Sequence, residues 1–327
     1  MTNVLVTGGA GYIGSHACKA LAKAGFTPIA FDNLNTGWAE AVKYGPLFKG
    51  DLLDPASIAQ AIETYKPVAV MHFAALSLVG ESMKDPAKYW HGNVMGGLNL
   101  IQATVNAGIK NFIFSSTCAT YGDQDGVVLT EDTPQYPINA YGGSKRAIEN
   151  MLVDFGNAFG LNHVIFRYFN VAGADPEGEL GEQHEPETHL IPLMLDAVAG
   201  KRPALTVFGS DYPTRDGTCI RDYVHVSDLV DAHVLGLKWL LEGKGNRVFN
   251  LGTGSGFSVR EVIEASRAVT NREVPIIEGE RRPGDATALV SGSERAISEL
   301  GWQPKRSNLR EMIQDAWTWA NKPRYQG

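Results

Sequence analysis

Short apolar runs alternate with amphipathic stretches through the first half of the chain. The runs fall at residues 4–6, 28–31, 47–48, 68–73, 111–115 and 163–168, and the segments between them place apolar residues at helical spacing. Strands that alternate with helices in this way form a parallel sheet with helices on both faces. The pattern therefore predicts an α/β protein with a doubly wound parallel sheet.

The alternation loosens after about residue 170, where glycine, proline and charged residues gather in longer loops. We therefore expect two domains, at 1–171 and 172–327, the second a smaller mixed α/β lobe that holds a substrate. Residues 226–241 predict a helix capped by Ser227 and residues 247–250 a strand, so parts of 224–251 are expected to return to the first domain. Further helices are predicted at 190–199, capped by Thr188, and at 307–320.

The first apolar run leads into Thr7-Gly8-Gly9-Ala10-Gly11-Tyr12-Ile13-Gly14. In a dinucleotide-binding turn, Gly8 permits the tight turn, Gly11 lets the backbone approach a pyrophosphate, and Gly14 allows close packing of helix on strand. Asp32 follows the second apolar run, where a carboxylate binds the ribose hydroxyls of NAD and repels the 2′-phosphate of NADP. These features predict a Rossmann-type domain that binds NAD.

Tyr141 and Lys145 are four residues apart in a segment with helical spacing that runs to Phe159, so both side chains lie on one helix face. A neighbouring ammonium favours tyrosinate, so we expect Lys145 to lower the pKa of Tyr141 and make it a base. Residues 111–117 predict a strand that ends in hydroxyl side chains at the ligand-binding edge of the sheet. Thr117 is therefore expected to meet Tyr141 across a substrate hydroxyl.

Composition limits the classes of molecule that the chain is expected to bind. Its 327 residues are 44% hydrophobic with a net charge of −7, and no Lys/Arg-rich run provides a surface for nucleic acid. The three cysteines are far apart, which argues against a disulfide framework and favours a cytoplasmic location. No apolar segment is long enough for a membrane span. We expect a small-molecule substrate, with no nucleic acid and no membrane.

One segment resembles a metal site at first sight. His184-Glu185-Pro186-Glu187-Thr188-His189 offers two imidazoles and two carboxylates. The spacing differs from a helical HExxH site, and Pro186 breaks the helix that would place both histidines on one face. From sequence we therefore expect no metal.

The glycine turn, the Ser115-Ser116-Thr117 strand end and Tyr141-Gly142-Gly143-Ser144-Lys145 together resemble the extended short-chain dehydrogenase/reductase family, and within it the enzymes that epimerise UDP-sugars at C4. The likeness runs nearly from end to end. Further motifs that carry it are Asp32-Asn33-Leu34, Gly50-Asp51-Leu52, His72-Phe73-Ala74-Ala75, Arg167-Tyr168-Phe169-Asn170, Arg221-Asp222-Tyr223-Val224-His225-Val226 and Arg281-Arg282-Pro283-Gly284-Asp285.

This resemblance implies reversible C4 epimerisation of UDP-galactose and UDP-glucose through a transient 4-keto sugar. Tyr141 would remove the C4 hydroxyl proton while hydride passes to a tightly bound NAD and then returns to the other face of the ketose. Lys145 would hold the cofactor ribose and tune Tyr141. The likeness also implies a homodimer packed through paired helices, one of which carries Tyr141 and Lys145.

The same resemblance implies two sets of binding residues. Those for NAD are Gly8, Gly11, Tyr12, Ile13, Gly14, Asp32, Asn33, Asp51, Leu52, Phe73, Ala74, Ala75, Asn93, Lys145 and Phe169. Those for the UDP-sugar are Thr117, Tyr141, Asn170, His189, Leu190, Phe208, Arg221, Tyr223, Arg282 and Asp285. Within the second set the two arginines suit a pyrophosphate, since guanidinium groups pair bidentately with phosphate oxygens.

Several alternatives stay open. Leu289 stands where some family members have a bulky tyrosine and others a small residue, so UDP-N-acetylhexosamines remain candidate substrates. A UDP-uronate 4-epimerase, which would need a site for a C6 carboxylate, also stays open. A nucleotide-sugar 4,6-dehydratase shares the Tyr/Lys pair, but that family has Asp-Glu after the active-site threonine, where this chain has Cys118 and Ala119. A protein that binds NAD without turnover is the remaining alternative, although such relatives typically lack the Tyr/Lys pair.

Overall fold

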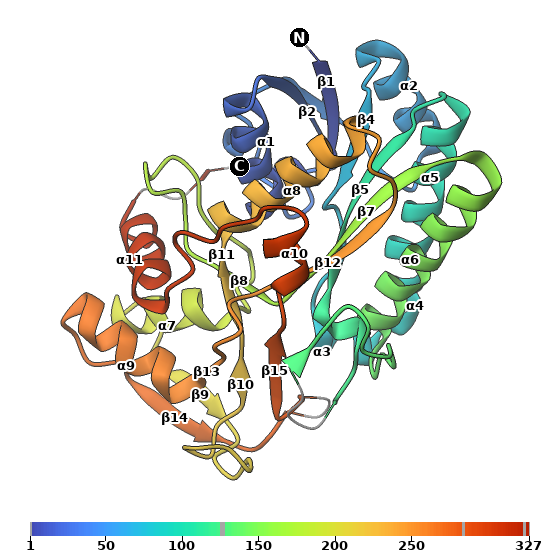
Figure 1. Cartoon of the computed structure of the whole chain (residues 1–327). Helices are drawn as coiled ribbons and strands as arrows, with labels where there is room; N and C mark the ends of the chain where they lie inside the picture. The colour runs from blue at the N-terminus through green and yellow to red at the C-terminus, as the bar shows by residue number, and fades with distance from the viewer. Residues whose placement is uncertain (1, 125–127, 283–284, 323–324, 327) are drawn as a thin grey trace.

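A sheet of seven parallel strands forms the centre of the larger lobe (Figure 1). The computed structural model describes residues 2–124, 128–282, 285–322 and 325–326. The strands, from edge to edge, are β12 (Arg247–Leu251), β7 (Asn162–Tyr168), β5 (Asn111–Thr117), β4 (Ala69–His72), β1 (Thr2–Thr7), β2 (Phe26–Asp32) and β3 (Leu47–Lys49). The order reverses between β1 and β4, which opens a crevice at the carboxyl ends of those strands. The expected doubly wound fold is confirmed.

Helices cover both faces of this sheet, as Figure 1 shows. On one face α1 (Tyr12–Lys23) packs beside α8 (Val226–Leu241), and on the other lie α2 (Pro55–Tyr65), α5 (Gly96–Asn106) and α6 (Ala140–Phe159). The central strands are apolar on both sides: Val4 and Val6 of β1 join the first core, and Leu5 joins the second. Burial on both faces explains why these strands read as continuous apolar runs.

Short helical segments connect the larger elements on the α6 side and at the strand ends. They are η1 (Ala39–Ala41), α3 (Val79–Lys84), α4 (Pro86–Tyr89), the π-helical η2 (Trp90–Met95) and η3 (Cys118–Thr120). Segment η2 continues directly into α5, so residues 86–106 form one helical run beside α6.

The smaller lobe holds three small sheets. Strand β8 (Asn170–Ala172) pairs with β11 (Tyr223–His225), and β9 (Leu205–Phe208) with β14 (Ile276–Gly279). The third sheet has the order β13 (Phe257–Ser258), β10 (Ile220–Arg221), β15 (Ala288–Ser291) and β6 (Val128–Leu129). Helices α7 (Leu190–Val198), α9 (Val259–Thr270) and α11 (Leu309–Ala320) share a core, and α10 (Glu294–Ser298) packs against β12. The domain limits at residue 171 stay a prediction.

Two predicted helix caps are wrong. His225, rather than Ser227, caps α8 by accepting the N–H of Ser227 at its ring nitrogen. Before α7, Glu187 Oε1 accepts the N–H groups of Thr188 and His189, so Thr188 donates rather than caps. The N-cap of α7 is His189, and its side chain does not cap that helix. Within the described residues, no helix is both long and apolar enough to cross a membrane.

Candidate active site

The glycine turn lies between β1 and α1, at the carboxyl edge of the large sheet. Gly8 has a φ of +73°, a left-handed conformation that residues with a Cβ rarely adopt. A Cβ on Gly14 would lie 2.0 Å from the carbonyl oxygen of Gly8, so only glycine lets the helix start this close to the turn. Gly11 occupies the N-cap and offers no capping side chain, which leaves the first-turn N–H groups available to an anion.

Asp32 ends β2 beside this turn. Its carboxylate accepts the N–H of Ala10 at 3.0 Å and the N–H of Leu34 at 2.9 Å. Burial raises the pKa of Asp32, although these two hydrogen bonds oppose the shift. Next to it, Asn33 Nδ2 donates to Asp51 Oδ2 at 3.1 Å, which joins the ends of β2 and β3. The carboxylate is thus oriented toward the turn, where a ribose would lie.

Asn93 connects this edge to α6. Its Oδ1 accepts the N–H of Leu76 at 2.8 Å, and its Nδ2 donates to the carbonyl of Leu76 and to Ser144 Oγ, both at 3.0 Å. It lies in the π-helical η2, a distortion that is frequent at functional sites. The predicted cofactor residues that follow the carboxyl ends of β1, β2, β3 and β4 are Gly8, Gly11, Tyr12, Ile13, Gly14, Asp32, Asn33, Asp51, Leu52, Phe73, Ala74 and Ala75.

Tyr141 and Thr117 come together from two elements. Asn139 caps α6 by accepting the N–H of Gly142 at 2.8 Å, which fixes where the helix begins and places Tyr141 in its first turn. Thr117 is the last residue of β5. Thr117 lies close enough to Tyr141 to lower the pKa of its phenol. Both hydroxyls therefore stand where a single substrate hydroxyl could contact them.

Lys145 follows one turn further along α6 and is buried. Its Nζ donates to the carbonyl of Ser115 at 2.9 Å and lies 4.9 Å from the ring centroid of Phe114. Burial lowers the pKa of Lys145 to about 7, against the opposing charge of Glu149. Lys145 can therefore change its protonation state near neutral pH.

The pKa of Tyr141 differs from the expectation. Burial raises it well above the usual value, the neighbouring Tyr168 adds to the effect, and Thr117 offsets only part of it. Lys145 directs its ammonium to a backbone carbonyl, and burial lowers its own charge. The net pKa of Tyr141 is therefore raised and not lowered as expected, because desolvation of the phenol is the largest cause.

A buried ion pair behind these residues was missed from sequence. Glu149 Oε1 accepts from Ser116 Oγ at 2.5 Å, and Glu149 Oε2 pairs with Arg167 Nη2 at 2.7 Å. Glu149 lies one turn after Lys145, and its charge raises the pKa of that lysine. The four-residue spacing from Lys145 was the signal that could have revealed it.

The smaller lobe reaches the end of β5 near β8. Asn170 and Tyr223 face each other in the β8–β11 register, and Asn170 acts to lower the pKa of Tyr223, which burial raises. Phe169, just before β8, packs with Cys118 and Leu289. Because Cys118 follows Thr117 directly, residues predicted for NAD and for the sugar meet at the end of β5.

The predicted pyrophosphate residues form two pairs. Arg221 Nη2 lies 3.5 Å from Asp285 Oδ1, and the guanidinium of Arg282 lies 3.9 Å from the ring centroid of Phe208. Burial raises the pKa of Cys118 to about 11 and Arg221 opposes this shift, so Arg221 acts close to the end of β5. The motif residues Pro283 and Gly284 lie outside the described residues.

His189 and Leu190 begin α7, but His189 is part of a cluster that the sequence argument did not expect. Glu182, His184, Glu187 and His189 place one possible ligand atom each within 4.8 Å of all the others. Burial would lower the pKa of His184, yet the carboxylates of Glu182 and Glu187 raise it to about 10. The sequence argument compared this segment only with a helical HExxH site, whereas in the structure a loop brings the four side chains together.

The fold defines a dinucleotide-binding enzyme of the Rossmann class, in which Tyr141 and Lys145 lie one turn apart on α6. The chain belongs to the NAD dependent epimerase/dehydratase family, because the sequence model of that family matches residues 4–252. It is 51% identical over 320 residues to a UDP-glucose 4-epimerase of Rhizobium meliloti (strain 1021), covering 98% of this chain and 97% of the relative.

Solved structures agree with this family. The crystal structure of UDP-glucose 4-epimerase from Brucella ovis in complex with NAD has a TM-score of 0.95 and 48% identity, over 98% of this chain and 99% of that chain. The UDP-Glc/GlcNAc 4-epimerase of Campylobacter jejuni has a TM-score of 0.85 and 40% identity over the same shares.

Proposed function

We propose that this protein interconverts UDP-galactose and UDP-glucose by epimerisation at C4 with a bound NAD. The observation that carries the proposal is the contact between Tyr141 and Thr117, with Lys145 one turn further along α6. These three residues stand at the carboxyl edge of the sheet, beside the glycine turn. The relatives at about half identity over nearly the whole chain support the same reaction.

The residues at the sheet edge fit NAD. The α1 N-terminus after Gly11 can receive the pyrophosphate, and the oriented carboxylate of Asp32 can accept hydrogen bonds from a ribose. Gly8 and Gly14 leave no space for a Cβ, so the backbone stays close to the cofactor path. When bound, NAD supplies reversible hydride transfer at C4 of the sugar.

Tyr141 and Thr117 handle the proton of the C4 hydroxyl. Thr117 positions that hydroxyl, and Tyr141 removes its proton in one direction and returns it in the other. Because burial raises the pKa of Tyr141, its anion needs positive charge nearby, which Lys145 provides in its protonated form. Because the pKa of Lys145 is about 7, Lys145 can also gain or lose a proton when Tyr141 does.

Arg221 and Arg282 hold the nucleotide while the ketose turns over. Arg221 pairs with Asp285, and the guanidinium of Arg282 lies over the ring of Phe208. Both guanidinium groups therefore lie in the smaller lobe. Anchoring the pyrophosphate leaves the hexose free to present its other face to the hydride. The reaction therefore ends with no net redox change.

The direct test is a proton NMR time course of the purified protein with UDP-galactose and no added NAD. Appearance of UDP-glucose signals without a methyl doublet supports C4 epimerisation with retained cofactor. A high-field methyl doublet would indicate a 4,6-dehydratase instead, and an unchanged spectrum would contradict the proposal. Tyr141→Phe is the matched control, because it removes only the hydroxyl.

UDP-N-acetylhexosamine is the second candidate substrate. Leu289 packs against the cluster that contains Phe169 and Cys118, and Cys118 directly follows Thr117, so the size of Leu289 is a candidate control of the space for the sugar. The Campylobacter relative is described as acting on both UDP-Glc and UDP-GlcNAc. If Leu289 controls access, Leu289→Ala raises the rate on the acetylated sugar relative to UDP-glucose, and Leu289→Tyr lowers it.

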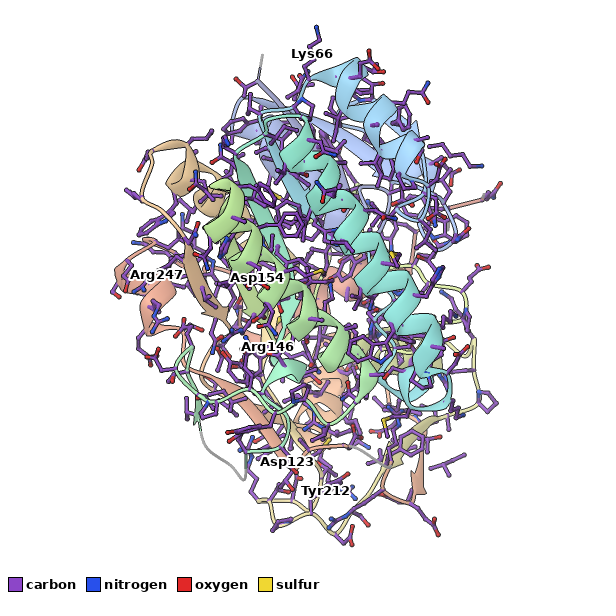
Figure 2. All side chains as sticks on the ribbon, turned by 90° about the vertical axis from the view of Figure 1, so that its right-hand side faces the viewer. Lys66, Asp123, Arg146, Asp154, Tyr212 and Arg247 are labelled. Carbon is purple, nitrogen blue, oxygen red and sulfur yellow. The ribbon has the colours of Figure 1, made fainter. Side chains whose placement is uncertain are left out.

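A homodimer packed through α6 is part of the proposal. Figure 2 looks onto this side of the molecule, where α6, marked by Arg146 and Asp154, lies beside the helical run of residues 86–106. The face is apolar and grooved: Met83, Trp90 and Ile138 are 52%, 46% and 47% exposed, and they line a hollow of about 680 Å³. Light scattering of wild type and Trp90→Glu tests it, because the charge should yield monomers.

A cytoplasmic location completes the proposal. The three cysteines are unpaired and buried, which suits a reducing compartment. Fractionation of the source cells, followed by immunodetection, tests this location.

A further inference from the structure

The loop that leads into α7 gathers two imidazoles and two carboxylates around one point. His184 Nδ1 lies 3.4 Å from Glu182 Oε1 and 3.7 Å from Glu187 Oε2. His189 Nδ1 lies 3.7 Å from Glu187 Oε1 and is paired with Glu182 Oε1. Each side chain thus offers one donor atom to a shared centre, from four positions within eight residues of chain.

The separations around His184 match a tetrahedral cation site. With metal–ligand bonds of about 2.0–2.1 Å, neighbouring ligands of a tetrahedral zinc ion lie roughly 3.3 Å apart. The two distances from His184 Nδ1 are within a few tenths of an ångström of that spacing. His189 Nδ1 is hydrogen-bonded to Glu182 Oε1, so these two atoms would move apart to bind one ion. Mixed imidazole and carboxylate ligands suit a transition metal such as zinc, whereas calcium and magnesium prefer oxygen ligands throughout.

A second observation points to a missing partner. Glu187 Oε2 and His184 Nδ1 are buried and lack a hydrogen bond of normal geometry within the described residues. The Glu187 side chain is only 9% exposed and directs Oε2 into the cluster. A buried polar atom without a partner is costly, and a cation at the shared centre would satisfy both atoms.

We propose that Glu182, His184, Glu187 and His189 bind one divalent transition-metal ion, for which Zn²⁺ is the best match. The two carboxylates balance the charge of the ion when both imidazoles are neutral. His189, 48% exposed, forms the open side through which an ion can enter.

Both lobes hold the ligands in place. Trp319 Nε1 donates to the carbonyl of Glu182 at 2.9 Å, and Glu187 Oε1 accepts the N–H groups of Thr188 and His189. Trp38, from the NAD side, donates to the carbonyl of Gln183 at 2.9 Å. Such outer contacts orient metal ligands.

The other acidic cluster of the molecule shows the contrast. Asp175, Glu177 and Glu179 surround Lys19 Nζ, which lies 2.7 Å from each of the three. An ammonium already occupies that centre, so we propose no metal there. This cluster provides a matched control for the test.

The ion would position the start of α7. His189 faces the cluster through Nδ1, so its Nε2 remains available to a ligand on the other side of the ring. If the proposed function is correct, the ion fixes His189 and Leu190 beside the UDP-sugar. The metal site itself does not depend on that function.

The test titrates the metal-stripped, NAD-loaded protein with Zn²⁺ against a chromophoric chelator and records the visible spectrum with Co²⁺. We expect one zinc per chain, a tetrahedral Co²⁺ spectrum, and zinc affinity at least about tenfold weaker in Glu187→Gln. Glu187→Gln keeps an oxygen for the two backbone N–H groups, and His184→Ala provides a second variant. Glu177→Gln should bind zinc as wild type does.

Two results would overturn the site: no zinc binding by wild type, or equal binding by wild type and by both ligand variants. Circular dichroism and the NAD content of each variant establish that it is folded. The NMR assay on the same samples reports separately on the proposed epimerisation, so failure of one proposal is distinguishable from failure of the other.

Discussion

Replacing Glu149 by glutamine should destabilise the protein strongly, because it leaves a buried guanidinium without its carboxylate. Glu149 is 1% exposed and Arg167 5% exposed. Arg167 donates to Glu149 three times, from Nε at 3.0 and 3.2 Å and from Nη2 at 2.7 Å. Removing one partner of a buried ion pair costs about 3–5 kcal/mol. Arg167 keeps neutral partners in Tyr121 and Gln135, so we expect a loss of about 3 kcal/mol, at the lower end of that range.

A surface pair of the same chemistry provides the control. Glu299 binds Arg247 with two hydrogen bonds, but their side chains are 36% and 37% exposed. Solvent screens such a pair, so Glu299→Gln should cost less than about 1 kcal/mol. Both variants change the same atoms, and the two sites differ in burial and in the further hydrogen bonds that Glu149 accepts from Ser116 and Gln135.

The assay is urea unfolding of the NAD-loaded proteins at pH 7, followed by tryptophan fluorescence. The free energy difference is the shift in midpoint multiplied by the common slope. Equal losses in Glu149→Gln and Glu299→Gln would refute the reasoning that burial decides the cost. The double variant with Arg167→Met should recover part of the loss, since it leaves no unpaired charge.

Three further predictions test the catalytic pair, the glycine turn and acid stability. Tyr141→Phe should lower the epimerisation rate by about 10² or more while the NAD content stays unchanged, and a wild-type rate by NMR would contradict its role as base. Gly14→Ala should reduce stability by about 1–3 kcal/mol and release NAD on gel filtration, because its Cβ would lie 2.0 Å from the Gly8 carbonyl; Gly80→Ala, with nothing within 4 Å, should not. Burial lowers the pKa of His233 to about 4, so the unfolded chain binds the extra proton between about pH 6.5 and pH 4. Stability should therefore fall as pH drops through this window, by about 1.4 kcal/mol per unit from this group, and His233→Gln should show a shallower fall in urea midpoints.

The sequence predicted the parts of the site that lie close together along the chain. Gly8 and Gly14 predict a turn whose conformation a Cβ would prevent. The spacing of Tyr141 and Lys145 predicts that both lie on one face of a helix. Period and spacing are local properties, so they are visible before folding. The catalytic and binding roles carried over from the family stay predictions, among them those of His189 and Arg221.

The predicted capping residues were wrong because each helix begins after a different residue from the one expected: His225 is the N-cap of α8, and His189, with no capping side chain, is the N-cap of α7. His225 reaches the amide of Ser227, and Glu187 reaches that of Thr188. Both reaches depend on the path of the preceding loop. Capping preferences identify residue types that are common at an N-cap, but the path of the preceding loop determines which residue occupies that position.

The sequence by itself determined the doubly wound sheet, the glycine turn and the spacing of Tyr141 and Lys145, because apolar period, backbone sterics and helix geometry act over a few residues. Only the tertiary structure decided the environment of those groups. Burial, rather than Lys145, controls the pKa of Tyr141, and Glu149 meets Arg167 across two elements. The tertiary structure also brought the side chains of four residues together, namely Glu182, His184, Glu187 and His189. Desolvation and charge pairing depend on which distant segments surround a group, and folding alone establishes that.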